Sequence, residues 1–227
     1  MSPRPADPGI RSALIDAAAR LVDEHGRDAL TIRRLAAEVG TSTMAIYTHF
    51  GSMDELMREV KKEGFARLSG YLEQVSKTSD PVADLAALGW AYSFNAMTNP
   101  HMYRQMFLEP ENDPEVSAVG FAAYEPLITA VQRCIDAGRF REEDPWSAAM
   151  QLWVMTHGAV TLHLGGYFDH ETGLEHVTAM AITAFVGFGD EREAAERSIQ
   201  RGLRRMERVM PLDPATATPP PSPARTR

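Results

Sequence analysis

Cysteine is nearly absent from this sequence, because Cys134 is the single cysteine among 227 residues. One thiol cannot form an intramolecular disulfide, and it cannot build a zinc site from several cysteines. Cysteine usage of this kind is typical of proteins that stay in a reducing compartment. We therefore expect the protein to act in the cytoplasm.

Long uncharged stretches are also scarce. Arg11, Asp16 and Arg20 interrupt the apolar positions near the start, so the sequence predicts no secretory signal. Residues 145–168 contain no Asp, Glu, Lys or Arg and are long enough to be considered as a membrane span. However, Gln151, two histidines and two threonines in this stretch would be poorly placed in lipid. We expect a buried helix of a dimer core there, and no contact with a membrane.

Positive charge is in deficit, with 23 Lys and Arg against 31 Asp and Glu and a net charge of -8. A balance of this sign argues against a protein that coats nucleic acid with its whole surface. Even the first fifty residues hold six arginines and six acidic residues. Binding to DNA would require segregated charges, with Arg33 and Arg34 facing phosphate, and would weaken steeply with salt.

The local signatures of common enzymes are missing: there is no G-x-S-x-G elbow, no P-loop and no H-E-x-x-H pair. Gly187 and Gly189 begin a dinucleotide-binding pattern, but Arg192 stands where its third glycine belongs. Acidic residues and histidines across 169–176 are metal ligands by type, yet their spacing fits no known site. We therefore expect no enzyme, no cofactor and no metal, with an all-helical enzyme or a small-molecule carrier as the alternative.

Apolar residues recur at helical spacing without strand-type alternation, which predicts an all-α fold. Aspartate–proline pairs mark helix starts, because aspartate caps a helix and proline fits its first position. These pairs begin at Asp7, Asp80, Asp113 and Asp144. After three short N-terminal helices, the expected helices are about 53–76, 81–98, 101–108, 115–137 with a kink at Pro126, 145–164, 174–188 and 191–209.

The most informative stretch is 31–56. Apolar residues lie at helical spacing across 31–39, and Gly40 then ends that helix with a residue suited to a left-handed cap. A hydroxyl side chain can cap the next helix, in which Ile46 and Phe50 point inward. The order of helix, tight turn and short helix predicts a helix-turn-helix, whose second helix fits the DNA major groove.

This stretch resembles the DNA-binding domain of TetR-type transcriptional repressors through Gly40, Ile46-Tyr47, His49-Phe50 and Asp54-x-Leu56. The resemblance covers residues 9–57, with Met53 where that family usually has lysine. It implies an N-terminal three-helix domain that reads DNA and a larger C-terminal helical domain that dimerises and binds a small-molecule effector. The expected ranges are 9–52 for the helix-turn-helix domain, 53–209 for the effector-binding and dimerisation domain, and 210–227 for a disordered Pro-rich tail.

Eight residues of this motif are predicted to contact double-stranded DNA. They are Arg33, Thr41, Ser42, Thr43, Met44, Tyr47, Thr48 and His49. Tyr47 and His49 flank the groove-facing positions and are expected to touch phosphate. The hydroxyls and Met44 would meet thymine methyl groups and mixed base edges. Ordinary surface positions on a short helix are the alternative.

A second resemblance lies further along the chain. Trp153, His157 and Gly158 are similar to the Trp-x-x-x-His-Gly signature of one class of TetR-type C-terminal domains. Trp153 and His157 share a helical face, and Gly158 allows another helix to approach closely. By analogy with the family, the helices from about residue 145 onward are candidates for the interface of a homodimer.

Aromatic and methionine side chains are dense in the C-terminal part, and they predict a pocket for a small, largely apolar effector. The predicted lining is Trp90, Phe94, Met97, Met102, Tyr103, Met106, Phe107, Tyr124, Trp153 and His157. Core packing is the alternative for any single one of them. Together these features predict a ligand-responsive transcriptional regulator, a repressor that binds a palindromic operator as a dimer and is released by its effector.

Overall fold

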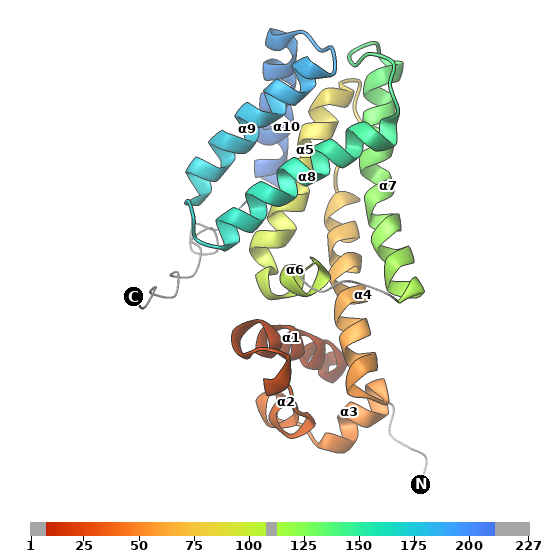
Figure 1. The fold of residues 1–227 in the computed structure, drawn as a ribbon, viewed down its shortest axis with the longest axis vertical. Coiled ribbons are helices and arrows are strands. Elements are labelled where there is room, and N and C mark those ends of the chain that lie inside the picture. Colours follow the sequence, from red (N-terminus) through yellow and green to blue (C-terminus); the bar gives the residue numbers. More distant parts are fainter. Residues whose placement is uncertain (1–7, 108–112, 212–227) are drawn as a thin grey trace. The chain divides into compact units, whose positions relative to one another are not determined.

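The computed structural model of the chain describes residues 8–107 and 113–211. Within those residues every regular element is helical, with ten α-helices and one short 3-10 helix (Figure 1). The all-α prediction is confirmed. None of these helices combines the length and the apolar character needed to cross a membrane. Residues 212–227 of the expected tail lie outside the described residues.

The chain divides into two compact units, each drawn from two parts of the sequence. Within the described ranges, unit 1 contains the residues up to 67 and 99–121, and unit 2 contains 68–98 and the residues from 122 on. Two helices, α4 (Met53–Leu72) and α7 (Pro114–Asp136), contribute residues to both units. The sequence predicts functional domains at 9–52 and 53–209. This division into compact units does not test those ranges, which remain a proposal.

Unit 1 is built on α1 (Pro8–His25), against which α2 (Ile32–Val39) and α6 (Pro100–Phe107) pack. A 3-10 turn, Arg27–Ala29, precedes α2, and α3 (Thr43–Phe50) follows it. The core that these helices share with α4 includes Leu14, Leu35, Ile46, Leu56 and Val60, each at most 1% exposed. Apolar burial of this kind fixes α3 against the rest of the unit.

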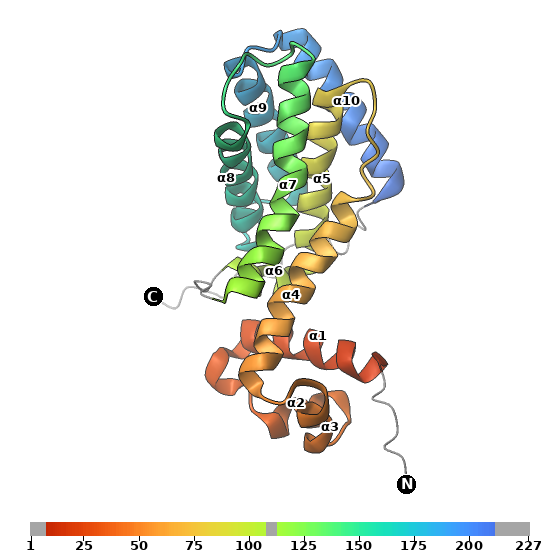
Figure 2. The ribbon, with the colours of Figure 1, turned by 90° about the vertical axis from the view of Figure 1, so that its right-hand side faces the viewer.

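Unit 2 is a bundle in which α5 (Pro81–Thr98) and α10 (Arg192–Val209) pack against each other (Figure 1). A second pair, α8 (Pro145–Leu164) and α9 (His170–Gly187), lies side by side (Figure 2). The part of α7 beyond residue 121 completes the bundle.

The core of unit 2 is densely packed. Gly202 of α10 lies so close to α5 that a Cβ atom there would be 2.3 Å from the carbonyl oxygen of Ala83. Cys134 is fully buried. The indole N–H of Trp90 donates a hydrogen bond of 3.3 Å to the carbonyl oxygen of Met210. Met210 is 2% exposed, so the packed chain extends one residue into the range that the sequence assigned to the tail.

Two helix limits differ from the prediction by more than one residue. α9 begins at His170 rather than at 174, because Asp169 caps it by accepting a hydrogen bond of 2.8 Å from the N–H of Thr172. α4 ends at Leu72 rather than at 76. The N–H of Gln74 bonds three residues back instead of four, so the chain closes into a turn there.

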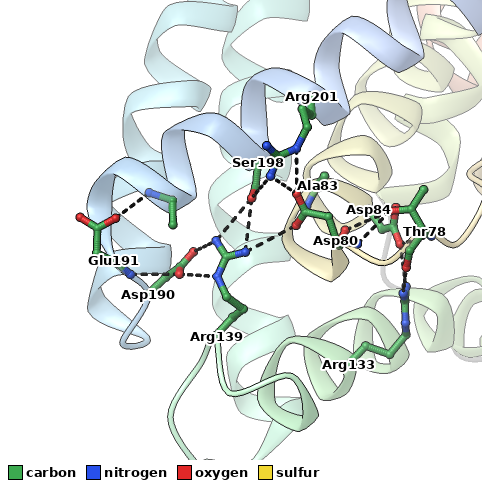
Figure 3. Close-up of polar contacts among 11 residues, drawn as sticks. Thr78, Asp80, Ala83, Asp84, Arg133, Arg139, Asp190, Glu191, Ser198 and Arg201 are labelled. Atoms are coloured by element: carbon green, nitrogen blue, oxygen red, sulfur yellow. Dashed lines mark hydrogen bonds and ion pairs between the residues drawn. The ribbon is translucent and has the colours of Figure 1, made fainter.

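A buried ionic network ties the start of α5 to α7 and α10, and Figure 3 shows the links from Arg133 of α7 to Asp84 and from Arg201 of α10 to Asp80. Asp84 is 2% exposed and accepts hydrogen bonds from the N–H of Thr78 at 2.7 Å and from Arg133 at 2.9 Å. Arg205 donates a further bond of 2.9 Å. Burial by itself would raise the pKa of Asp84, but these hydrogen bonds together outweigh it and leave the pKa lowered. Three helices are therefore joined through one ionised carboxylate.

Candidate nucleic-acid interface

α2 and α3 form the predicted helix-turn-helix, and local caps fix the turn between them. Thr31 caps α2 by accepting a hydrogen bond of 3.2 Å from the N–H of Arg34. Gly40 ends α2 in the left-handed conformation, with φ 68° and ψ 33°, which glycine adopts without steric cost. Ser42 then caps α3 by accepting a hydrogen bond of 3.2 Å from the N–H of Ala45.

Two side chains anchor α3, and the other side of the helix is exposed. Ile46 is 1% exposed and Phe50 is 5% exposed, and both belong to the core of unit 1. In contrast, Met44 is 69% exposed and Tyr47 is 49% exposed. Large apolar side chains that gather on one exposed surface are typical of an interaction site.

All eight residues predicted to bind DNA lie in unit 1. The exposed ones are Arg33, Ser42, Thr43, Met44, Tyr47 and Thr48. Thr41 and His49 are half-buried, and the His49 ring lies against that of Phe50 with 6.0 Å between their centroids. The structure therefore gathers seven of the eight on the turn and α3, whereas Arg33 lies on α2.

Ion pairs neutralise several acidic residues around the motif. Arg20 of α1 donates a hydrogen bond of 2.7 Å to Glu38 of α2, and this bond lowers the pKa of Glu38. Arg27 pairs with Asp54 at 3.2 Å. An acid that is paired in this way repels phosphate less, which helps a chain of negative net charge to approach DNA. Arg33 is exposed on the same motif.

The ten residues predicted to line an effector pocket are divided between the two units. Met102, Tyr103, Met106 and Phe107 lie on α6 in unit 1. The first three of these are 3–4% exposed, and Met102 is part of the unit 1 core. Unit 2 holds Trp90, Phe94, Met97, Tyr124, Trp153 and His157. The six residues in unit 2 come from α5, α7 and α8.

In unit 2 an aromatic cluster surrounds His157. The hydroxyl of Tyr92 lies 2.8 Å from Nδ1 of His157, and the ring centroid of Trp153 is 5.1 Å from that of His157. The Tyr124 ring lies 6.3 Å from that of Trp153. Burial lowers the pKa of His157, whereas burial and the charge of Asp144 raise the pKa of Tyr124 to about 12. The predicted lining omits Tyr92, and its contact with His157 could not be predicted, because no local pattern links residues 65 positions apart.

α8 and α9 expose apolar side chains. Val154 and Leu162 of α8 are 57% and 45% exposed, and Met180 of α9 is 38% exposed. Val154, Gly158 and Leu162 follow one another at four-residue steps, so they share a face of α8. Apart from its chain neighbours and the backbone of its own helix, no atom lies within 4 Å of the place where a Cβ atom of Gly158 would be. The surface is therefore open along this face, and exposed apolar surface of this kind is typical of protein interfaces.

Sequence models of two known families match the chain. The model described as "Bacterial regulatory proteins, tetR family" matches residues 14–60, which include the whole helix-turn-helix. The model described as "Tetracyclin repressor-like, C-terminal domain" matches residues 85–185. This second match does not assign the C-terminal domain to the Trp-x-x-x-His-Gly class, so that assignment remains a prediction.

Individual proteins are similar over most of the chain. An uncharacterized HTH-type transcriptional regulator of Mycobacterium tuberculosis is 27% identical over 161 residues, which are 70% of this chain and 72% of that protein. A protein of unknown function from Rhodococcus sp. RHA1 is 28% identical, with a TM-score of 0.70 over 84% of this chain and 100% of that one. AibR, in a crystal structure with isovaleryl coenzyme A and operator DNA, shares the fold at 19% identity, with a TM-score of 0.55 over 67% of this chain and 84% of that one.

The two family matches follow each other along one all-helical chain. The N-terminal match falls on the capped turn and the exposed α3, and the C-terminal match falls on the helices after it. From these matches and the similar regulator of Mycobacterium tuberculosis, we conclude that the chain belongs to the TetR family of transcriptional regulators.

Proposed function

We propose that this regulator is a homodimeric repressor that binds a near-palindromic operator through α3 and leaves it when a small, largely apolar effector binds. Repression is favoured by the description of the matched C-terminal family, which is named after a repressor. Binding to operator DNA is typical of TetR regulators, and we place the protein in the cytoplasm, where that DNA lies. Members of this family are not enzymes, which excludes the enzyme alternative.

The observation that carries the DNA-binding proposal is the exposed side of α3. Thr43, Met44, Tyr47 and Thr48 project from a helix that Ile46 and its capped turn hold in place. Small hydroxyls, a thioether and a phenol fit the major groove without steric conflict. A two-fold dimer would present two such helices to successive major grooves, ~34 Å or a multiple of it apart, so the operator should be near-palindromic.

A double variant tests this assignment. Thr43→Ala combined with Tyr47→Ala should weaken operator binding by at least ~10-fold, because it removes contacts to base edges and phosphate. The operator is obtained by selecting bound fragments of genomic DNA, and affinity is measured by fluorescence anisotropy at several salt concentrations. As a matched control, Thr129→Ala combined with Tyr167→Ala removes the same two side-chain types at exposed positions of unit 2. Equal affinities of the two double variants would contradict the assignment.

The exposed apolar faces of α8 and α9 support the dimer. Val154→Glu would place a charge on that face, and a charge buried without a partner destabilises an interface strongly. Sedimentation at micromolar concentration should then show a monomer, with operator binding lost as well. Val209→Glu is the matched control, because Val209 is 50% exposed on α10. A wild-type protein that is itself monomeric at this concentration would overturn the proposal.

The aromatic cluster around His157 supports an effector site in unit 2. Trp153 and Tyr124 offer apolar ring surface, and the hydrogen-bonded pair of Tyr92 and His157 offers a polar group that could orient a ligand. AibR is a precedent for a protein of this fold crystallised with both an acyl thioester and operator DNA. The remaining residues of the predicted lining, those on α6 included, stay a prediction.

Thermal shift measurements with a panel of hydrophobic compounds test the effector site. A ligand should raise the melting temperature of the wild type and release it from operator DNA. Tyr92→Phe keeps the ring but removes the hydroxyl, so it should weaken the effect of a ligand that uses the polar pair. A broad panel in which no compound shifts the melting temperature would count against an apolar effector.

The proposed response requires that effector binding changes the position of α3. α4 is continuous and contributes residues to both units, so we expect it to transmit the change. Within unit 1, α6 is held to α1 by Asp23, whose Oδ2 lies 2.6 Å from Nδ1 of His101 and 2.6 Å from Nη1 of Arg104. The coupling free energy between effector and operator is typically ~1–3 kcal/mol. Asp23→Asn should keep operator affinity but reduce the release by effector, and an unchanged response would exclude this contact from the coupling.

A further inference from the structure

The outward chemistry of α3 is unusual for a helix proposed to read bases. Residues Thr43–Phe50 contain no Arg, Lys, Asn, Gln, Asp or Glu. Arg and Lys make the common hydrogen bonds to guanine, Asn and Gln make those to adenine, and Asp and Glu accept from cytosine. α3 therefore lacks the side chains that read bases through paired hydrogen bonds. Hydroxyls, one phenol ring, apolar groups and the half-buried imidazole of His49 remain.

Part of the hydroxyl chemistry is already used inside the helix. Thr48 Oγ1 donates a hydrogen bond of 2.9 Å to the carbonyl oxygen of Met44. Because a hydroxyl has a single proton, Thr48 cannot donate to a base while it keeps this bond. Its Oγ1 atom is directed to the helix backbone. Thr48 can therefore offer a partner its methyl group and the acceptor lone pairs of Oγ1, but no proton.

Met44 dominates the exposed face of α3. Its side chain is 69% exposed, and Tyr47 at 49% and Thr48 follow it at the next positions of the same face. A thioether side chain is apolar and flexible, so it gains from contact with another apolar group and adapts to its shape. The edges of the bases offer one such group in the major groove, the C5-methyl group of thymine.

We propose that Met44 sets base specificity in this regulator by packing on the C5-methyl group of a thymine in each half of the operator, with the Thr48 methyl group beside the contact. The inference rests on the proposed function, because it requires α3 in the major groove. It adds a residue that determines specificity and a chemical group that this residue reads.

Replacing thymine by uracil tests the contact directly. Deoxyuridine removes the C5-methyl group but keeps base pairing and the hydrogen-bonding edges. Each thymine of the selected operator is replaced in turn, and the dissociation constant is measured by fluorescence anisotropy at one salt concentration. One thymine per half-site should respond, with about 4-fold weaker binding for one half-site and about 15-fold for both, as expected for the loss of one buried methyl group per half-site.

Variants assign the effect to Met44. Met44→Ala should bind the thymine and uracil operators equally well, because the contact is already lost. Met44→Leu retains an apolar side chain and should retain the discrimination. Thr48→Val keeps a methyl group and removes the hydroxyl, so it should also discriminate. The exposure of Met44 means that these exchanges leave the core of unit 1 intact.

The outcomes separate this inference from the proposed function. If the protein prefers its selected operator but no thymine responds to uracil, the reading by Met44 is wrong and the DNA-binding proposal stands. The same holds if Met44→Ala discriminates as strongly as the wild type. If the protein prefers no duplex over random competitor DNA, both proposals fail.

Discussion

Exchanging Gly202 for alanine would place a methyl group where α10 crosses α5. The new Cβ atom would lie 2.3 Å from the carbonyl oxygen of Ala83 and 3.2 Å from the Cβ atom of Ala86. Cβ atoms are essentially never found within 3.0 Å of such an atom, and a backbone oxygen cannot rotate away as a flexible side chain can. The variant can fold only if α10 moves away from α5, which loosens the core cluster that contains Trp90 of α5 and Met206 of α10.

Two opposing free-energy terms set the size of this effect. Alanine stabilises a helix interior by ~1 kcal/mol relative to glycine. Overpacking a core, including the backbone shifts that it forces, costs ~1–3 kcal/mol. Because Gly202 meets backbone, the cost should lie at the upper end of this range and exceed the gain, with a net loss of ~1–2 kcal/mol. Gly89 of α5 is a matched control, since no atom beyond its chain neighbours and its own helix backbone lies within 4 Å of its Cβ position. There, alanine should stabilise by ~0.5–1 kcal/mol.

Tryptophan fluorescence provides the assay. All three tryptophans, Trp90, Trp146 and Trp153, belong to unit 2, so their emission follows the unfolding of that unit in urea. Protein concentration is held constant, because dimerisation would shift the midpoint. Gly202→Ala should unfold at lower urea than the wild type, and Gly89→Ala at the same or higher urea. Equal midpoints for the two alanine variants would refute the argument from the close approach of α5 and α10.

Further outcomes follow from one buried carboxylate, one half-buried histidine and one turn. Asp84→Ala leaves the half-buried Arg133 and Arg205 without their carboxylate and should lower the free energy of unfolding in urea by ~1.5–3 kcal/mol. Because the pKa of Asp84 is lowered in the folded chain, its ionised carboxylate stabilises the fold above ~pH 4, and this stabilisation is lost as the pH falls through the pKa of the folded state. In Asp84→Asn, the free energy of unfolding should therefore depend less on pH in the acid range. Burial lowers the pKa of His157, so as the pH falls the imidazole is protonated in the unfolded chain before it is protonated in the folded one. The melting temperature should therefore decrease as the pH is lowered from ~6.5, and it should decrease less in His157→Gln. Gly40→Ala forces a side chain into the left-handed conformation and should destabilise unit 1 by ~1 kcal/mol in circular dichroism melts.

The helices could be predicted from the sequence where their signals are local. α5, α7 and α8 begin at Pro81, Pro114 and Pro145, which are the prolines of three aspartate–proline pairs. Gly40 also has the left-handed conformation that its place after an apolar helix predicts. The start of α9 was predicted wrongly, because its cap, Asp169, is not followed by proline. Most helix starts and ends can thus be predicted from signals that extend over only a few residues.

Pairings between distant residues could not be predicted. Tyr92 meets His157 across 65 positions, and Asp84 meets Arg205 across 121 positions. Helical periodicity tells which face of a helix is buried but not which helix covers it. The same limit affects the predicted pocket. The dense apolar stretch 90–107 is real, but its α5 and α6 parts belong to different compact units.

Cys134 makes the chain convenient for labelling. It is the single cysteine, it has no exposed surface, and burial raises its pKa to about 12. A thiol in this state reacts poorly, so it would not compete with a cysteine placed on the surface. Ser12→Cys, at an exposed position of α1, would carry one spin label per protomer without removal of the native thiol. In the proposed dimer, the label-to-label distance would then report whether a bound ligand changes the spacing of the two α3 helices.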